Sequence, residues 1–171
     1  VYQPGGQVHA AAFAPEKDTA FVAAGAAGLH VVRLRPRVEK VGAIEAQDFV
    51  FDAAVSGSRL YVAEGLGGLS VWDCAQAAAP KLLGRYQPKE GRVFQVMVPP
   101  PGRHALLHVG EVRLEIVDVA DPAAMRLVCQ DVRDGLLYRL PLADGSLDDR
   151  YAGCLWHASG FYWYDLKAEP G

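Results

Sequence analysis

The chain has 171 residues, of which 51% are hydrophobic and 22% charged, and its formal net charge is −3. This balance is typical of a globular domain with one sizeable core, and it excludes a strongly basic nucleic-acid binder and an acidic tail. No apolar run approaches the roughly 18–20 residues of a membrane-spanning helix, so the sequence predicts neither a nucleic-acid partner nor a membrane span.

The first residues and the cysteines give little sign of compartment. The chain starts at Val1, and no charged segment followed by an apolar stretch marks a signal peptide. The three cysteines, Cys74, Cys129 and Cys154, are odd in number and lack C-x-x-C spacing, which argues against zinc and thioredoxin-like redox sites. We expect them to be small buried thiols in strands.

Short apolar runs separated by Gly, Pro, Asp and Ser predict strands along the whole chain. In chain order, segment 19–32 aligns with segment 59–72 without a gap, and both read as strand, glycine turn, strand. Looser copies of this hairpin lie at 104–118 and 151–166. The hairpin is therefore the centre of a repeat.

Further strands flank each hairpin. A strand before it starts at residues 8, 50, 93 and 137, which are 42, 43 and 44 residues apart, and a strand after it is expected at 38–43, 81–86 and 126–129. Four strands in about 40–45 residues is the period of a propeller blade. The sequence therefore predicts an all-β fold, a β-propeller of four-stranded antiparallel blades with about four repeats, in which neighbouring blades bury each other's faces.

The predicted repeats cover residues 8–46, 47–90, 91–134 and 135–171 of a single propeller domain or part of one. Residues 1–6 are interpreted as the tail of a preceding outer strand, because Tyr2-Gln3-Pro4 recurs as Tyr86-Gln87-Pro88. Both ends thus fall inside a blade. Either the termini exchange strands to close a ring of four, or the chain is a piece of a larger propeller; the shortness of the stub favours the piece. Exposed blade faces would then be covered by remaining blades or a companion chain.

The repeats carry a family resemblance that is strongest in the second, extends to the first and third, and is least in the fourth. Residues 53–73 and 79–86, and the segment Leu114-Glu115-Ile116-Val117-Asp118 with its continuation to Pro122, resemble the LVIVD repeat of bacterial and archaeal β-propellers. The resemblance implies the propeller fold and an exported or cell-surface location. It implies no catalytic residue.

The third position of each inner strand is predicted to approach the central channel, where propellers often bind ligands. Ala10, Asp52, Gln95 and Arg139 occupy it, so Asp52, Gln95 and Arg139 are candidate ligand-binding residues, although wet channel walls are often polar without any ligand. Glu64 and His108 are interpreted as sharing a position at the hairpin mouth, where they are candidates for a binding surface.

Other polar residues are better explained structurally. Asp73, Asp118 and Asp165 end the third strand of their units, where a carboxylate can accept hydrogen bonds from the following turn. Trp72, Trp156 and Trp163 are expected in the core between blades rather than on a sugar-binding surface.

No cofactor, metal or catalytic residue is predicted. His104 and His108 lie about 13 Å apart on a strand, too far for one metal. Residues 144–149 lack the glycine at the sixth position of a calcium loop, where Asp149 stands. The segment Gly65-Leu66-Gly67-Gly68 joins two strands, whereas a dinucleotide-binding loop joins a strand to a helix. No serine occupies a nucleophile motif.

Two functions remain open. The first is a non-catalytic interaction or scaffold module that binds a protein or glycan through its loops or channel. The alternative is the propeller portion of an extracytoplasmic enzyme, a glycan hydrolase or lyase, which needs two or more clustered acids. Asp52 is the only acidic residue on the predicted inner strands, which favours the first function.

Overall fold

The computed structural model describes residues 2–14, 18–111, 113–132, 136–137, 151–156 and 160–165. They form four antiparallel sheets. The strands of the first three sheets are β1 (Ala10–Ala14), β2 (Thr19–Ala23), β3 (Leu29–Arg33), β4 (Glu39–Ile44), β5 (Asp52–Ser56), β6 (Arg59–Ala63), β7 (Leu69–Asp73), β8 (Lys81–Tyr86), β9 (Val93–Met97), β10 (His104–Val109), β11 (Arg113–Asp118) and β12 (Arg126–Val132). The fourth sheet contains β13 (Leu136–Leu137), β14 (Tyr151–Trp156) and β15 (Gly160–Asp165).

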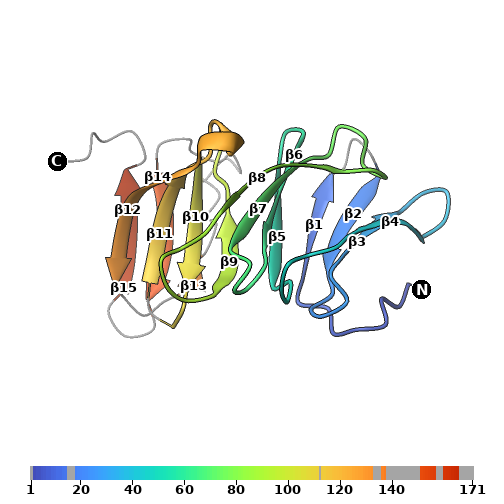
Figure 1. Ribbon diagram of the computed structural model, residues 1–171, viewed down its shortest axis with the longest axis horizontal. Helices are drawn as coiled ribbons and strands as arrows, with labels where there is room; N and C mark the ends of the chain where they lie inside the picture. The colour runs from blue at the N-terminus through green and yellow to red at the C-terminus, as the bar shows by residue number, and fades with distance from the viewer. Residues whose placement is uncertain are drawn as a thin grey trace.

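Each of the first three sheets has four strands paired in chain order, from an inner to an outer strand. Figure 1 shows these sheets following one another along the long axis of the molecule, from β1–β4 to β9–β12. A single 3-10 turn, η2 (Pro122–Ala124), and no α-helix occurs within the described part of the chain. The predicted all-β fold of four-stranded antiparallel sheets is therefore confirmed, while the exact repeat boundaries stay a prediction.

Glycines close the central hairpin of the second sheet. Gly65 and Gly68 have φ angles of 55° and 77°, in the left-handed region that side chains other than glycine rarely adopt. This turn lets the Glu64 amide donate to the Gly68 carbonyl at 2.8 Å and holds β6 against β7.

The core lies between the sheets. The face of the second sheet that carries Leu60 and Val62 packs with Phe21, Leu29 and Val31 of the first sheet. Its other face, which carries Tyr61, Leu69 and Val71, forms a separate cluster with residues of the third sheet that include Val96, Leu107 and Val117. The two faces of the second sheet are thus buried against the first and the third sheet, as the repeat pattern predicts.

Close packing between sheets depends on glycine in the outer strands. The register of the outer strand shifts at the same point in each of the first three sheets, between Val31 and Val32, between Val71 and Trp72, and between Ile116 and Val117. Gly84 of β8 lies at this shift, opposite Val71, and a Cβ atom there would overlap the Pro122 carbonyl of η2 in the third sheet. Gly42 of β4 makes the corresponding approach to Ala78 of the second sheet.

Candidate binding surface

The inner strands bring the predicted channel residues to one equivalent position. Ala10 pairs with Ala23, Asp52 pairs with Ala63, and Gln95 pairs with His108 across the same step of their sheets. The expected equivalence of Ala10, Asp52 and Gln95 is therefore confirmed. Arg139 lies outside the described residues.

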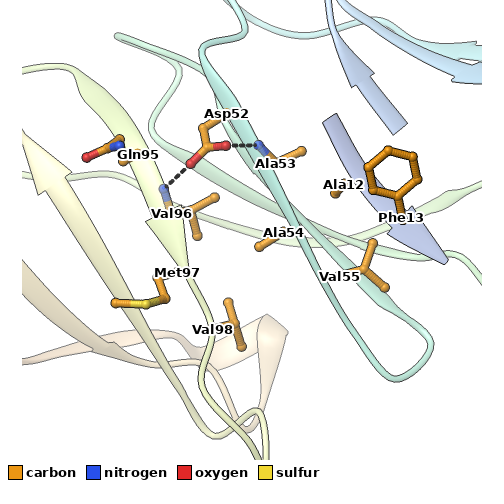
Figure 2. Close-up of a pocket in the computed structure, with 10 residues that line it drawn as sticks. All are labelled: Ala12, Phe13, Asp52, Ala53, Ala54, Val55, Gln95, Val96, Met97 and Val98. Atoms are coloured by element: carbon orange, nitrogen blue, oxygen red, sulfur yellow. Dashed lines mark hydrogen bonds between the residues drawn. The ribbon is translucent and has the colours of Figure 1, made fainter. Parts of the chain in front are cut away.

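A pocket of about 320 Å³ runs along these inner strands. Asp52 and Gln95 both line it, together with apolar residues of β1, β5 and β9 and the segment after β9 (Figure 2); the apolar lining consists of Ala12, Phe13, Ala53, Ala54, Val55, Val96, Met97 and Val98. Because β1 contacts β5 and β5 contacts β9, three successive sheets contribute to one groove.

The Asp52 carboxylate is held by backbone amides. One oxygen accepts a hydrogen bond from the Val96 amide at 3.0 Å, and the other accepts from the Ala53 amide at 2.8 Å (Figure 2). Burial raises the pKa of Asp52 above its ordinary value, and the two amides oppose that shift. Both oxygens already have partners, so Asp52 joins two inner strands and offers only its remaining lone pairs to a ligand.

Glu64 does not face a binding surface, contrary to expectation. Its side chain is fully buried, and its carboxylate pairs with the Arg85 guanidinium at 2.7 Å and accepts from the Gln47 amide at 2.8 Å. The Ser70 hydroxyl donates to the other carboxylate oxygen and itself accepts from Trp72 Nε1 at 2.7 Å. Glu64 therefore belongs to a buried polar network that ties three strands together.

His108 does not occupy the position of Glu64. It pairs with Leu114, as Ala63 pairs with Leu69, so the residue equivalent to Glu64 is Val109. Gly65 and Gly110, which directly follow Glu64 and Val109, both have a positive φ, consistent with this equivalence. His108 is half-buried and lies 6.1 Å from the Phe94 ring, measured between centroids.

The structure reveals a row of five aromatic rings that was not predicted. Neighbouring centroids are 4.9 Å apart for His9 and Phe49, 4.7 Å for Phe49 and Phe51, 4.8 Å for Phe51 and Phe94, and 6.1 Å for Phe94 and His108. His9 is exposed and the other four rings are half-buried. This aromatic row crosses three sheets near the start of their inner strands, β1, β5 and β9.

A signal for the aromatic row was present in the repeats. His9, Phe51 and Phe94 each immediately precede the channel positions Ala10, Asp52 and Gln95. Tyr138 precedes Arg139 in the same way but lies outside the described residues. An aromatic or histidine ring thus recurs at one position, and comparing the repeats there would have predicted the row.

The strand-ending aspartates have the predicted structural role where their side chains are described. The Asp73 carboxylate accepts from the Ala75 amide at 2.8 Å, and the Asp118 carboxylate accepts from the Ala120 amide at 3.0 Å. The hydrogen bond from Ala120 is the largest cause of the lowered pKa of Asp118, ahead of the charge of Arg103. Trp72 packs against the cluster between the first two sheets, as expected for a core residue.

Among the described residues, no group of three histidine, cysteine or acidic side chains is placed to hold a metal ion. The predicted turn at residues 144–149 lies outside them. Within the same part of the chain, no helix has the length and apolar character required to cross a bilayer.

Comparison with known proteins supports the repeat and the fold. The LVIVD repeat model matches residues 50–88 and 107–130, which correspond to β5–β8 and to β10–β12. No curated protein matches the chain by sequence.

Several solved structures share the fold. Sqt1 from Saccharomyces cerevisiae aligns over 94% of this chain and 45% of its own, with a TM-score of 0.72 and 13% identity. BamB from Moraxella catarrhalis aligns over 96% of this chain and 48% of its own, with a TM-score of 0.66 and 15% identity. The chain therefore spans less than half of these two proteins.

The computationally designed protein Ika4 has a length closer to that of this chain. It aligns over 97% of this chain and 94% of its own, with a TM-score of 0.71 and 10% identity. At such identities these three likenesses concern the fold alone.

Proposed function

Because this chain is a β-propeller that carries LVIVD repeats, we propose that it is a non-catalytic interaction module that binds a protein segment at the aromatic row. The observation that carries the proposal is the continuous contact of His9, Phe49, Phe51, Phe94 and His108 across three sheets. Partly exposed aromatic side chains on a rigid scaffold are typical of protein-binding hot spots.

The ring geometry favours a protein over a glycan. A sugar packs flat on an open aromatic face, but the rings of this row meet edge to face or tilted, with interplanar angles of 76° for His9 and Phe49 and 78° for Phe51 and Phe94. Neighbouring edges therefore occupy part of the ring faces. Side chains of a bound protein can fill the uneven surface that remains.

The alternative of a glycan hydrolase or lyase lacks a second acid at the groove. Asp52 is the sole carboxylate among the described residues that line the 320 Å³ pocket, and both of its oxygens accept backbone hydrogen bonds. A glycosidase needs two carboxyl groups on either side of the scissile bond. The groove is therefore better suited to binding than to acid–base chemistry.

The first sheet offers a further surface for association. Phe13 on β1 is 58% exposed and Val8, just before β1, is 50% exposed, although the neighbouring Ala12 and Ala14 are buried. This exposure supports the proposal that further blades or a companion chain cover the sheet. An exported or cell-surface location is proposed from the LVIVD resemblance.

Selection of binding peptides from a random display library tests the main proposal. Peptides selected on the wild-type protein are expected to bind the Phe94→Ala variant about tenfold or more weakly, as for an interface hot spot. The Leu82→Ala variant is the matched control, because Leu82 is exposed on the outer strand β8 and belongs neither to the row nor to the lining of the 320 Å³ pocket. Circular dichroism checks that both variants are folded.

Two outcomes would contradict the proposal. The first is a set of peptides that bind both variants as tightly as the wild type. The second is binding of defined oligosaccharides, measured on a glycan array, that depends on Phe94 while no peptide does. A hydrolytic activity on those oligosaccharides that is lost in Asp52→Asn would support the enzyme alternative instead.

A further inference from the structure

A second pocket, of about 370 Å³, lies at the other end of β5 from Asp52. The turn between β5 and β6 contributes Ser56, Ser58 and Arg59, and the loop before β10 contributes Gly102 and Arg103. The second and third sheets thus share a pocket whose polar lining consists of two arginines, two serines and the tyrosine Tyr61, without a carboxylate.

Arg59 differs from the other partly buried arginines of the described chain. Arg85 pairs with Glu64 at 2.7 Å, and Arg113 pairs with Glu115 at 3.2 Å, so these guanidinium groups have buried carboxylate partners. Arg59 instead donates through Nη1 to the carbonyl oxygens of Val119 and Ala120, both at 3.1 Å. Among the described residues, no carboxylate lies within ion-pair distance of it.

The acidic groups around the pocket do not balance its positive charge. Asp118 lies 3.7 Å from Arg103 and 3.5 Å from Arg126, so one carboxylate is shared by two guanidinium groups. Asp73 is opposite Arg59 in the strand register, but it forms no ion pair with Arg59, and one of its oxygens accepts from Ala75. A partly buried cation that faces two carbonyl oxygens and the Tyr61 phenol, without a carboxylate, is better stabilised by an anion.

The remaining wall supplies neutral hydrogen-bond donors. The hydroxyls of Ser56 and Ser58 make no hydrogen bond to any other described residue, and both residues are at least partly exposed. Burial raises the pKa of the Tyr61 phenol, so the aromatic wall stays uncharged. Serine hydroxyls and a guanidinium fork are the donors that proteins use to bind phosphate and carboxylate oxygens.

We propose that this pocket, formed by Arg59, Arg103, Ser56 and Ser58, binds a small oxyanion. The Arg59 guanidinium provides the partly buried charge, Arg103 adds a second, more exposed charge from the loop before β10, and the two serine hydroxyls complete the donor set. The shared chemistry is that of a phosphate, sulfate or carboxylate group. The site is distinct from the aromatic row, because it lies at the opposite end of the inner strands.

Calorimetric titration of the full chain tests the proposal at constant ionic strength, with inorganic phosphate, sulfate and acetate as separate probes. Saturable binding of at least one probe is expected, and the comparison tells a tetrahedral anion from a carboxylate. The Arg103→Gln variant is expected to bind that probe about tenfold more weakly, since a charge-assisted hydrogen bond is lost. Ser56→Ala is expected to weaken binding less.

Arg37→Gln is the matched control, because the Arg37 side chain is 82% exposed in the loop between β3 and β4 and does not line the pocket. The affinity of the Arg37→Gln variant for the anion probe should equal that of the wild type. Arg59→Gln also removes two carbonyl contacts, so its result counts only if circular dichroism shows a folded protein. Absence of saturable binding by all three probes, or equal loss in Arg37→Gln and Arg103→Gln, would overturn the proposal.

Discussion

The carboxylate of Asp52 on β5 accepts a hydrogen bond from the amide of Val96 on β9 at 3.0 Å, so an acidic side chain of one sheet supports the inner strand of the next. The pair lies in the groove at the point where the sheets converge. Because the carboxylate accepts hydrogen bonds from backbone amides, its first effect is on the geometry of the groove. Its effect on any ligand then follows from that geometry.

Removal of this carboxylate is expected to destabilise the fold. Asp52→Ala leaves the partly buried Val96 amide without its partner, which costs about 1–3 kcal/mol in the free energy of unfolding. Urea denaturation measures the change. Glu45→Ala, which removes an equal charge from an exposed position, is expected to change the stability by less than about 0.5 kcal/mol.

The pH dependence of stability provides an independent check that the Asp52 carboxylate is buried. Its folded-state pKa is raised above the ordinary 3.8, chiefly by burial, so the folded chain holds this proton more tightly than the unfolded chain does. The wild type should therefore gain stability relative to Asp52→Asn as the pH falls through the raised pKa towards 3.8, and lose it as the pH rises. A stability difference that does not vary with pH would contradict the assignment.

The buried network around Glu64 predicts a larger effect. Glu64→Ala leaves the partly buried Arg85 guanidinium without its carboxylate and removes the acceptor of Ser70, so we expect a loss of about 3–5 kcal/mol. Chemical denaturation followed by tryptophan fluorescence measures it. Glu39→Ala, which breaks exposed ion pairs with Arg33 and Arg37, should cost no more than about 1 kcal/mol.

A double variant separates charge from packing. In Glu64→Met with Arg85→Met both charges are gone, so no unpaired ion remains and much of the lost stability should return. A double variant as unstable as Glu64→Ala would show that the hydrogen bonds to Gln47 and Ser70, rather than the ion pair, carry the network.

The strands could be predicted because their determinants are local. The strand predicted at 81–86 has those bounds in the structure, and the strand, glycine turn, strand pattern of segment 59–72 corresponds to β6 and β7. Both are recognisable because apolar residues on both faces are bracketed by glycine or proline turns. The second inner strand starts at Asp52 rather than at Val50. Val50 fills the core between sheets and forms only an isolated bridge to Gly25, so the apolar run extends beyond the strand.

The side-chain environment of the site could not be predicted in the same way. Glu64 is buried because Arg85 and Gln47, distant in the chain, converge on it. When these partners are unknown, a single carboxylate in a turn is predicted to be exposed to solvent. The aromatic row likewise depends on three sheets being adjacent. Its repeated ring at His9, Phe51 and Phe94 was visible, but its significance follows only from the distances.

The close approach of Gly84 to the third sheet predicts that a methyl group is not tolerated there. In Gly84→Ala the new Cβ would overlap the Pro122 carbonyl, so β8 or η2 must move, at a cost of about 1–3 kcal/mol. Thermal denaturation measures the cost. Leu83→Ala, a change at the adjacent exposed position, is the control and should be nearly neutral, and a similar loss in both variants would contradict the explanation.

Tyr2 and His30 predict a loss of stability in mild acid. The Tyr2 hydroxyl lies 2.5 Å from His30 Nδ1, and His30 Nε2 lies 3.1 Å from the Ala27 carbonyl. A neutral imidazole satisfies both contacts if Nε2 carries the hydrogen and Nδ1 accepts from the phenol. Burial, followed by the charge of Lys40, lowers the pKa of His30 below 6.5, so the buried ring stays neutral.

Since the folded-state pKa of His30 is lowered, the unfolded chain binds the proton more tightly. The contribution of His30 to stability is therefore complete above pH 6.5 and is lost as the pH falls from 6.5 through the lowered pKa. Urea denaturation between about pH 7.5 and pH 5 should show a steeper decline for the wild type than for His30→Gln. His104, whose pKa is also lowered by burial, is present in both proteins and does not affect the difference. Equal slopes in the wild type and His30→Gln would show that His30 titrates as it does in the unfolded chain.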